Sequence, residues 1–196
     1  MNRAFADHIT KEDIQQLPLI SFEGKIHIID THEKCINAVH HLRNQVVLGF
    51  DTETKPTFVK GEYNPTALIQ LATSDHAYLF RLNKLGYPTS LFELMEDPTI
   101  TKLGISILDD LKDLQKLKSF TPQGFIDLNH KARELGVEHI GVRKLAAIFL
   151  EYRISKNQQV SNWENDELSQ GQQRYAATDA WICLEIHQQL ERKGYL

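Results

Sequence analysis

Three strand-like runs follow one another in the first half of the chain without a helical pattern between them, and this order limits the possible folds most strongly. The runs are Val46–Thr54, Thr66–Thr73 and Ala77–Leu82, and glycine, proline and a Ser-Asp pair separate them. Successive strands joined by such short connections predict an antiparallel meander. A fourth run, Lys25–Asp30, alternates like a strand and precedes them.

Helical periodicity dominates the rest of the chain. We expect a helix after the first strand, capped by Asp30 or Thr31 and ending at about Arg43. Further elements are expected in the order short helix near Ser90–Met95, strand Lys102–Ile105, helix Ile107–Leu117, strand Phe125–Leu128, and helices Leu128–Leu135, Val142–Phe149 and Leu168–Lys193, with an irregular segment at 153–166. The pattern predicts an α/β fold in which helices flank a mixed, partly antiparallel central sheet.

The bulk properties indicate one ordinary domain. The 196 residues contain no internal repeat or Gly/Ser/Pro-rich linker, so we expect an N-terminal extension, residues 1–19, and one domain, residues 20–196. No apolar run approaches the roughly twenty residues of a membrane span, and the N-terminus lacks the apolar core of a secretory signal. A cytoplasmic protein without membrane contact is therefore expected. Cys35 and Cys183 are far apart and predict buried thiols in helices, without a disulfide or zinc finger.

Two acids end the first strand of the meander. Asp51 and Glu53 are two residues apart, so their side chains project from the same face of the strand and can converge on one ion. A solvated strand end would show the same pattern. The pair alone is therefore a weak signal.

Two further aspartates lie on apolar faces of expected helices. Asp110 shares its face with Ile107 and Leu114, so it should point inward, whereas Asp109 should face solvent. In the last helix, Tyr175 and Asp179 are one turn apart within an apolar stripe. A buried carboxylate requires a cation, a hydrogen-bond partner or a raised pKa, and a Tyr-to-Asp hydrogen bond or an ion pair would also satisfy Asp179.

Four acids on three separate elements meet one chemical requirement together. Carboxylate oxygens are the ligands that Mg²⁺ and Mn²⁺ prefer, and four negative charges balance two such ions. Two ions about 3.5–4 Å apart can bind a phosphodiester, activate a water molecule and stabilise the leaving oxygen. The net charge of −4 does not exclude such a nucleic-acid enzyme, because metal cations fill its acidic site.

The acids and the tyrosine together resemble the three exonuclease motifs of the DEDD superfamily, in their expected order. Tyr175, four residues before Asp179, matches the DEDDy subclass, and Arg174 stands where the other subclass has histidine. The resemblance runs from about Ile20 to Arg192 and includes Gly49–Glu53, Ala67–Leu71, Ser161–Trp163, Leu168–Ser169 and Gln173–Ala180. In these stretches the chain resembles the exonuclease domain of Werner-syndrome-type proteins and, next, ribonuclease D.

The resemblance implies a ribonuclease-H-like fold and a 3′–5′ exonuclease that releases nucleoside 5′-monophosphates from a 3′ end. It implies that Asp51, Glu53, Asp110 and Asp179 hold two metal ions, with Asp51 contacting both. Tyr175 would orient the attacking water, since a phenol with a pKa near 10 is a poor base at neutral pH.

Substrate contacts are expected next to these motifs. Thr52 lies within the first motif, and the loop 55–60 that follows offers Lys55 and Phe58 for phosphate contact and base stacking, although such a loop is common on any surface. Lys156 belongs to a second basic group that could line the strand path or face solvent; its other members are Arg143, Lys144 and Arg153.

Two other features have simpler interpretations. Trp163 is expected to be a packing anchor for the irregular segment. His40 and His41 have no third metal ligand nearby in the sequence, which favours structural or solvated roles.

The partner is expected to be a nucleic acid with a 3′ end, with DNA favoured by the Werner-type resemblance. Ribonuclease D-like activity on RNA is the first alternative, because selection between the sugars depends on recognition of the 2′-hydroxyl. A non-catalytic nucleic-acid-binding module is the second alternative. Such a module usually lacks one of the acids, and here all four are present with the tyrosine.

Overall fold

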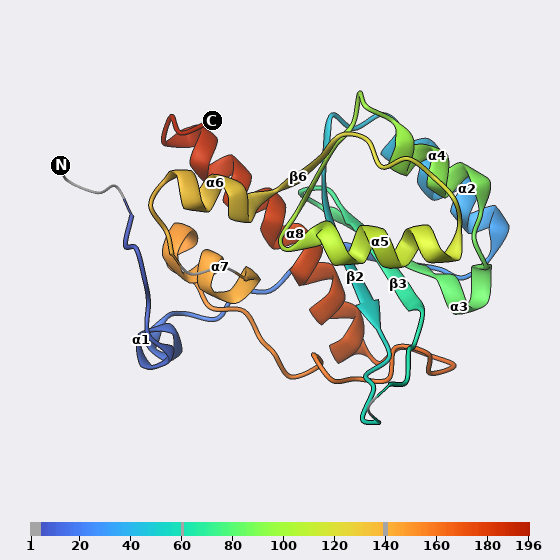
Figure 1. The fold of residues 1–196 in the computed structure, drawn as a ribbon, viewed down its shortest axis with the longest axis horizontal. Helices are drawn as coiled ribbons and strands as arrows, with labels where there is room; N and C mark the ends of the chain where they lie inside the picture. Colours follow the sequence, from blue (N-terminus) through green and yellow to red (C-terminus); the bar gives the residue numbers. More distant parts are fainter. Residues whose placement is uncertain (1–4, 60, 139–140) are drawn as a thin grey trace.

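The computed structural model describes residues 5–59, 61–138 and 141–196 and contains a six-stranded mixed sheet between two helical layers (Figure 1). The strands are β1 (Lys25–Ile29), β2 (Val47–Thr54), β3 (Thr66–Ala72), β4 (His76–Arg81), β5 (Thr101–Gly104) and β6 (Phe125–Asp127), in the order β1-β4-β3-β2-β5-β6. β2, β3 and β4 pair antiparallel, whereas β1, β5 and β6 join the sheet through parallel pairs. The expected meander and the mixed α/β sheet are confirmed.

Helices cover both faces of the sheet. They are α1 (Lys11–Gln16), α2 (His32–Leu42), α3 (Leu82–Leu85), α4 (Thr89–Glu96), α5 (Ile107–Leu117), α6 (Leu128–Glu134), α7 (Val142–Leu150) and α8 (Gln170–Arg192). One apolar cluster joins α2, α4 and α5 to Phe50 of the sheet, and another joins α6, α7 and α8 to Leu103. α2 belongs to the apolar cluster on the face of β2 that carries Phe50, and α8 packs against the other face at Gly49. None of the helices in the described ranges is long and apolar enough to cross a bilayer.

The caps of α2 and α8 explain where these helices begin. Thr31 accepts a hydrogen bond from the Lys34 amide, as expected for the cap of α2. Ser169 and Gln172 form a reciprocal capping box, so α8 begins at Gln170 rather than at the expected Leu168.

Three short elements differ from the sequence-based expectation. α1 lies in the extension and was not predicted, because its six residues carry a single buried apolar side chain, Ile14. The run expected to be a strand up to Leu82 ends at Arg81, and Leu82 begins α3. The strand expected to end at Leu128 likewise ends at Asp127, whose carboxylate caps α6 by accepting from the Asn129 amide.

The described part of the extension, residues 5–19, packs on the domain. Phe5 is buried with its ring 4.8 Å from that of Phe149, and the Arg153 amide donates to the Pro18 carbonyl at 2.9 Å. The boundary between extension and domain at residue 19 stays a prediction. Both cysteines are free and buried in helices, as expected.

Candidate active site

The site begins on β2, where three alternate residues face α8. Gly49, Asp51 and Glu53 share one face of the strand because side chains alternate along it. The strand pairs in register with β3 up to Glu53, opposite Leu68, and the register shifts immediately afterwards. The two carboxylates therefore lie at the point where the regular ladder ends.

Gly49 lets α8 approach the strand. A Cβ atom at this position would lie 2.0 Å from the carbonyl oxygen of Ala180, so only glycine allows the two backbones to lie this close. Ala180 directly follows Asp179, whose side chain is buried with 5% exposure. The contact between strand and helix thus brings Asp179 to the face that carries Asp51 and Glu53.

Three carboxylates converge as a result. One oxygen from each of Asp51, Glu53 and Asp179 lies within 4.8 Å of the other two. Carboxylate oxygens are hard ligands, and buried carboxylates this close together repel one another when ionised. The arrangement therefore fits a divalent cation such as Mg²⁺ or Mn²⁺. The expected convergence of the acids is therefore present for three of the four.

Burial and mutual repulsion hold protons on these acids. Burial, reinforced by Asp179 and Asp110, raises the pKa of Glu53 to about 9, and burial raises the pKa of Asp179 to about 7. Burial and the neighbouring acids also raise the pKa of Asp51 well above its ordinary value. These shifts mark a site that favours cations.

Asp110 reaches the same region from α5, outside this group of three. Its carboxylate accepts a hydrogen bond of 2.5 Å from the Thr52 hydroxyl, and its charge contributes to the raised pKa of Asp51 and of Glu53. Asp109 is exposed and pairs with Lys112 at 2.9 Å. The predicted orientations of both aspartates are confirmed. Thr52, expected at the substrate, contacts this acid.

Tyr175 stands one turn before Asp179 and faces the acids. Burial, followed by the charges of Asp179 and Glu53, raises the pKa of its phenol above the ordinary value. The Tyr175 ring lies 6.0 Å from that of Trp163, which is fully buried, so the predicted packing role of Trp163 is confirmed.

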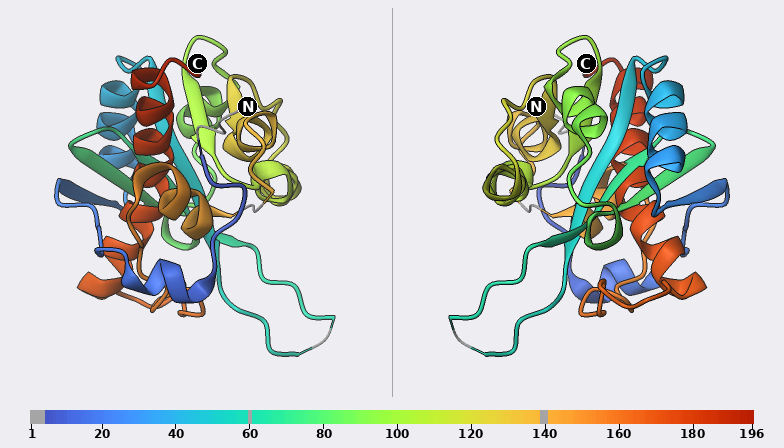
Figure 2. Two further views of the ribbon diagram at one scale, coloured as in Figure 1. Left: turned by 90° about the vertical axis from the view of Figure 1, so that its left-hand side faces the viewer. Right: turned by 90° about the vertical axis from the view of Figure 1, so that its right-hand side faces the viewer.

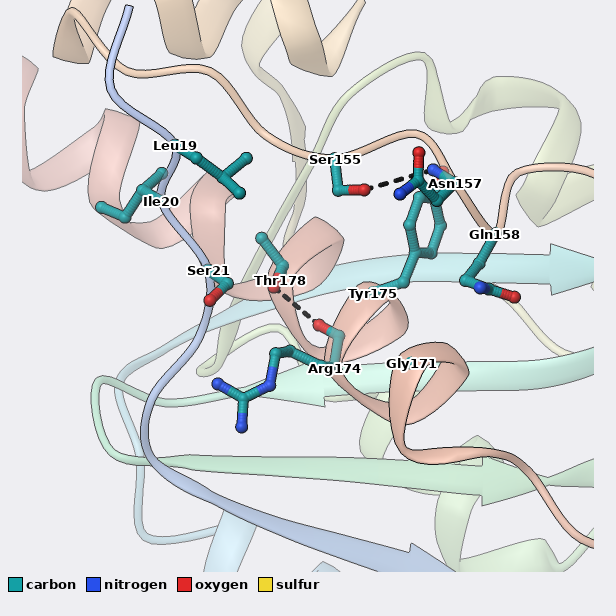
Figure 3. A pocket seen from close by; sticks show the side chains of 10 residues that line it. All are labelled: Leu19, Ile20, Ser21, Ser155, Asn157, Gln158, Gly171, Arg174, Tyr175 and Thr178. Atoms are coloured by element: carbon teal, nitrogen blue, oxygen red, sulfur yellow. Dashed lines mark hydrogen bonds between the residues drawn. The ribbon is translucent and has the colours of Figure 1, made fainter.

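A pocket of about 220 Å³ is lined in part by Tyr175 (Figure 3). The N-terminal segment, the irregular segment and α8 line it; the residues are Leu19, Ile20, Ser21, Ser155, Asn157, Gln158, Gly171, Arg174, Tyr175 and Thr178. Figure 3 shows Tyr175 of α8 and Asn157 of the irregular segment among the side chains that line this pocket.

The expected substrate residues lie in three different environments. Lys55 pairs with Glu164 at 3.4 Å, which neutralises part of its charge. Phe58 is 85% exposed on the loop between β2 and β3, which projects from the body of the molecule in Figure 2. Lys60, at the end of the predicted loop, lies outside the described residues. Lys156 is exposed and lines a cavity of about 340 Å³ together with Arg143 and Lys144.

Arg143 has a relation to the acids that its sequence position does not reveal. Its charge acts on Asp179 and limits the rise of that pKa, and its buried Nε has no hydrogen-bond partner in the described structure. The residue belongs to the first turn of α7, after Gly141, whose φ is 100°. Only the packing of α7 on α8 brings this cation toward the last motif.

Comparison with known protein families identifies the family of this chain, and that family agrees with the geometry of the site. Residues 26–194 match the family model described as a 3′-5′ exonuclease, so the chain belongs to this family of the DEDD superfamily, a class of hydrolases.

Individual relatives share the domain within longer chains. The human exonuclease mut-7 homolog is 32% identical, and the match covers 75% of this chain and 20% of that protein. The mouse bifunctional 3′-5′ exonuclease/ATP-dependent helicase WRN is 30% identical, over 91% of this chain and 13% of that protein. The chain thus spans a small part of the length of these relatives.

Solved structures share the fold. The Aedes aegypti Nibbler EXO domain superposes with a TM-score of 0.80 at 25% identity and covers 89% of this chain and 94% of its own. RNase D from Escherichia coli gives a TM-score of 0.76 at 24% identity over 88% of this chain and 47% of its own. The expected ribonuclease-H-like exonuclease fold is confirmed.

Proposed function

We propose that this domain is a two-metal-ion 3′–5′ exonuclease that hydrolyses the terminal phosphodiester of a nucleic acid and releases nucleoside 5′-monophosphates. The observation that carries the proposal is the convergence of Asp51, Glu53 and Asp179 within 4.8 Å, with Tyr175 beside them. The family model that matches residues 26–194 is described as a 3′-5′ exonuclease, which supports the direction and the reaction class of the proposal.

Three converging carboxylates and a fourth from α5 would hold the cations. Asp51, Glu53 and Asp179 supply oxygens at one point, and Asp110 adds a fourth carboxylate that the Thr52 hydroxyl orients. When bound, two Mg²⁺ or Mn²⁺ ions supply an activated water and stabilise the charge that develops on the phosphate oxygens. The raised pKa values of the acids explain why the site needs these ions to be fully ionised.

Tyr175 would position the water rather than take its proton. Burial and the neighbouring carboxylates keep the phenol protonated at neutral pH, so its hydroxyl can donate one hydrogen bond and accept another. Trp163 packs near the Tyr175 ring and fixes its orientation. The role of Tyr175 is therefore one of orientation, which depends on the hydroxyl and not on its ionisation.

The nucleic-acid strand would reach the acids between an exposed aromatic ring and a basic cavity. Phe58 offers an exposed aromatic ring for stacking on bases, and the cavity lined by Arg143, Lys144 and Lys156 offers cations for phosphates. Arg143 connects this cavity to the acids through its effect on Asp179. Lys55 would have to leave Glu164 before it could bind a phosphate.

DNA is the substrate that we favour, because the chain matches the WRN exonuclease over 91% of its length. RNA is the alternative, since RNase D has the same fold. The metal-binding carboxylates cannot separate the two sugars, because the ions that they would hold act on the phosphate that both nucleic acids share.

Digestion of matched 5′-labelled DNA and RNA strands of one sequence tests the substrate and the products. We expect Mn²⁺- or Mg²⁺-dependent ladders, faster on DNA, with nucleoside 5′-monophosphates as the products identified by chromatography. EDTA should abolish both reactions. Faster shortening of RNA would replace the DNA assignment by the exoribonuclease, and folded protein that cleaves neither strand would contradict the nuclease proposal.

A further inference from the structure

Four cations from three segments of the chain line one cavity of about 340 Å³. Lys11 belongs to α1 of the extension, Arg143 and Lys144 belong to the first turn of α7, and Lys156 belongs to the irregular segment. Among the described residues no carboxylate lines this cavity; its other members are Ile14, Gln15, Gly141, Val142 and Gln159. The cavity therefore concentrates positive charge in a protein whose net charge is −4.

The charges in this cavity are not neutralised by acids of the protein. None of the four cations forms an ion pair within residues 5–59, 61–138 and 141–196, whereas Lys34, Lys112 and Lys131 each pair with a neighbouring acid. The Nε atom of Arg143 is buried and has no hydrogen-bond partner in this part of the chain. An unpaired buried donor is costly, and a charged donor bonds most strongly to an anion. The cavity is therefore suited to an anion from outside the protein.

The helix α1 turns its basic face toward the cavity and its acids away from it. Lys11 is followed at three and four residues by Ile14 and Gln15, which places these side chains on one face of the helix. All of them line the cavity, whereas Glu12 and Asp13, the acids of this helix, do not. The extension thus presents a cation rather than an acid to the start of α7.

Backbone contacts on both sides of α1 hold the extension in this position. The Glu138 amide donates to the Asp7 carbonyl at 2.9 Å, before the helix. After the helix, the Arg153 amide donates to the Pro18 carbonyl at 2.9 Å, and the Arg153 Nε donates to the Leu17 carbonyl at 2.9 Å. The fold therefore sets the position of α1 beside the domain, and with it the position of its first residue.

The start of α7 forms part of the wall of the cavity and adds to its preference for an anion. Gly141, Val142 and Arg143 line the cavity, and within the described residues the first turn of the helix has neither a side-chain cap nor an acid. The amide groups at the start of a helix carry a partial positive charge. These amides and the side-chain cations therefore favour the same anion.

Arg143 connects the cavity to the acids of the candidate active site. Its charge limits the rise of the Asp179 pKa, so the guanidinium lies near that carboxylate. Asp179 is one of the acids that would hold ions at the phosphate that is cut. A 3′–5′ exonuclease places the last nucleotide at these ions, so every other phosphate of the strand lies on its 5′ side. A phosphodiester is thus the anion that can reach the cavity.

We infer that this cavity binds a backbone phosphate on the 5′ side of the bond that is cut, and that Lys11 makes the extension part of the substrate-binding surface. The inference rests on the proposed function and adds to it a contact from a segment outside the catalytic domain. Lysine and arginine contact phosphates whatever the base or the sugar. The cavity should therefore bind DNA and RNA strands alike.

The salt dependence of strand binding by the full chain tests this cavity. Fluorescence anisotropy of labelled DNA and RNA single strands of one sequence is measured in EDTA, so that the strands are not cleaved. The variants are Lys11→Gln, which removes the charge, and Lys11→Arg, which keeps it. Lys25→Gln is the matched control with the same change of charge, at an exposed lysine of the edge strand β1 that does not line the cavity.

We expect Lys11→Gln to reduce the slope of log affinity against log salt concentration by about 0.7, the value for one phosphate contact with a single strand. Relative to about 1 M salt, this change makes binding at about 0.1 M salt roughly fivefold weaker than that of wild type. The loss should be equal for DNA and RNA. Lys11→Arg should restore the slope, and Lys25→Gln should bind like wild type.

Equal slopes and affinities of wild type and Lys11→Gln would overturn the proposal. An equal loss in Lys25→Gln would reveal a general effect of net charge and would overturn it as well, and a loss confined to one sugar would exclude a phosphate as the ligand. Circular dichroism checks folding, and Lys11→Ala, which favours a helix, replaces Lys11→Gln if that variant does not fold. The assay involves no cleavage, so failure of the cavity is distinct from failure of the proposed nuclease.

Discussion

Replacement of Gly49 by alanine should disrupt the approach of α8 to β2 that assembles the acids. The added Cβ would lie 2.0 Å from the Ala180 carbonyl oxygen, whereas real Cβ atoms essentially never come within 3.0 Å of such an atom. The obstacle is backbone, so it cannot rotate away. α8 must therefore shift by about 1 Å, and Asp179, the residue before Ala180, must move with it.

The size of the effect follows from this displacement. Overpacking of a well-filled interior lowers the free energy of unfolding by about 1–3 kcal/mol. A misplacement of about 1 Å at a catalytic group can cost roughly a hundredfold in rate. We therefore expect Gly49→Ala to lower stability moderately and the rate of nucleotide release by about a hundredfold under conditions where the variant is folded.

Urea unfolding and a nuclease assay on one protein preparation measure both effects. Gly171→Ala is a matched control in α8, because its Cβ would come no closer than 3.4 Å to Gln158 and alanine favours the helix by up to about 1 kcal/mol. This control should be as stable as wild type or more so, and active. Full stability and activity of Gly49→Ala would refute the reasoning that close packing of the helix places Asp179.

Three further predictions concern the acids, the tyrosine and the loop. Burial raises the pKa of Glu53 from 4.5 to about 9, so between these pH values the metal-free folded protein keeps a proton that the unfolded chain releases. Urea titrations should therefore show the free energy of unfolding falling as pH rises from 4.5 to about 9. Saturating Mn²⁺ should make this decline smaller. Tyr175→Phe should lower kcat about 10- to 1000-fold while calorimetry shows unchanged Mn²⁺ binding, and loss of metal binding would contradict the orienting role. Phe58→Ala should raise KM for single-stranded substrates with little effect on kcat, because the exposed ring would no longer contribute roughly 1–3 kcal/mol of base-stacking free energy. An unchanged KM would exclude Phe58 from the path of the nucleic-acid strand.

Local periodicity predicted much of the fold and the orientation of single acids. The alternation along β2 placed Asp51 and Glu53 on one face, and the helical stripe separated the inward Asp110 from the exposed Asp109. These features depend only on the repeat of a strand or a helix, which the sequence shows directly. Ends of elements were less predictable, because caps such as Ser169 and Asp127 decide them through single hydrogen bonds.

Relations between distant elements could not be read from periodicity. The closeness of Asp179 to Asp51 depends on a backbone contact between Gly49 and Ala180, and the effect of Arg143 on Asp179 depends on how α7 packs on α8. Lys11 likewise joins Arg143 and Lys156 around one cavity only because the extension packs on the domain. Such contacts arise from tertiary packing, for which no local pattern in the sequence exists.

The central claim is that the acidic cluster performs metal-dependent cleavage from a 3′ end, and a digestion of 5′-labelled single strands by wild type and Asp51→Asn tests it most directly. The substitution keeps the size of the side chain and removes one of the converging carboxylates. The account predicts a Mn²⁺-dependent ladder that shortens from the 3′ end with wild type and no ladder with the folded variant. Equal ladders from both proteins, or products that arise from internal cuts, would contradict it.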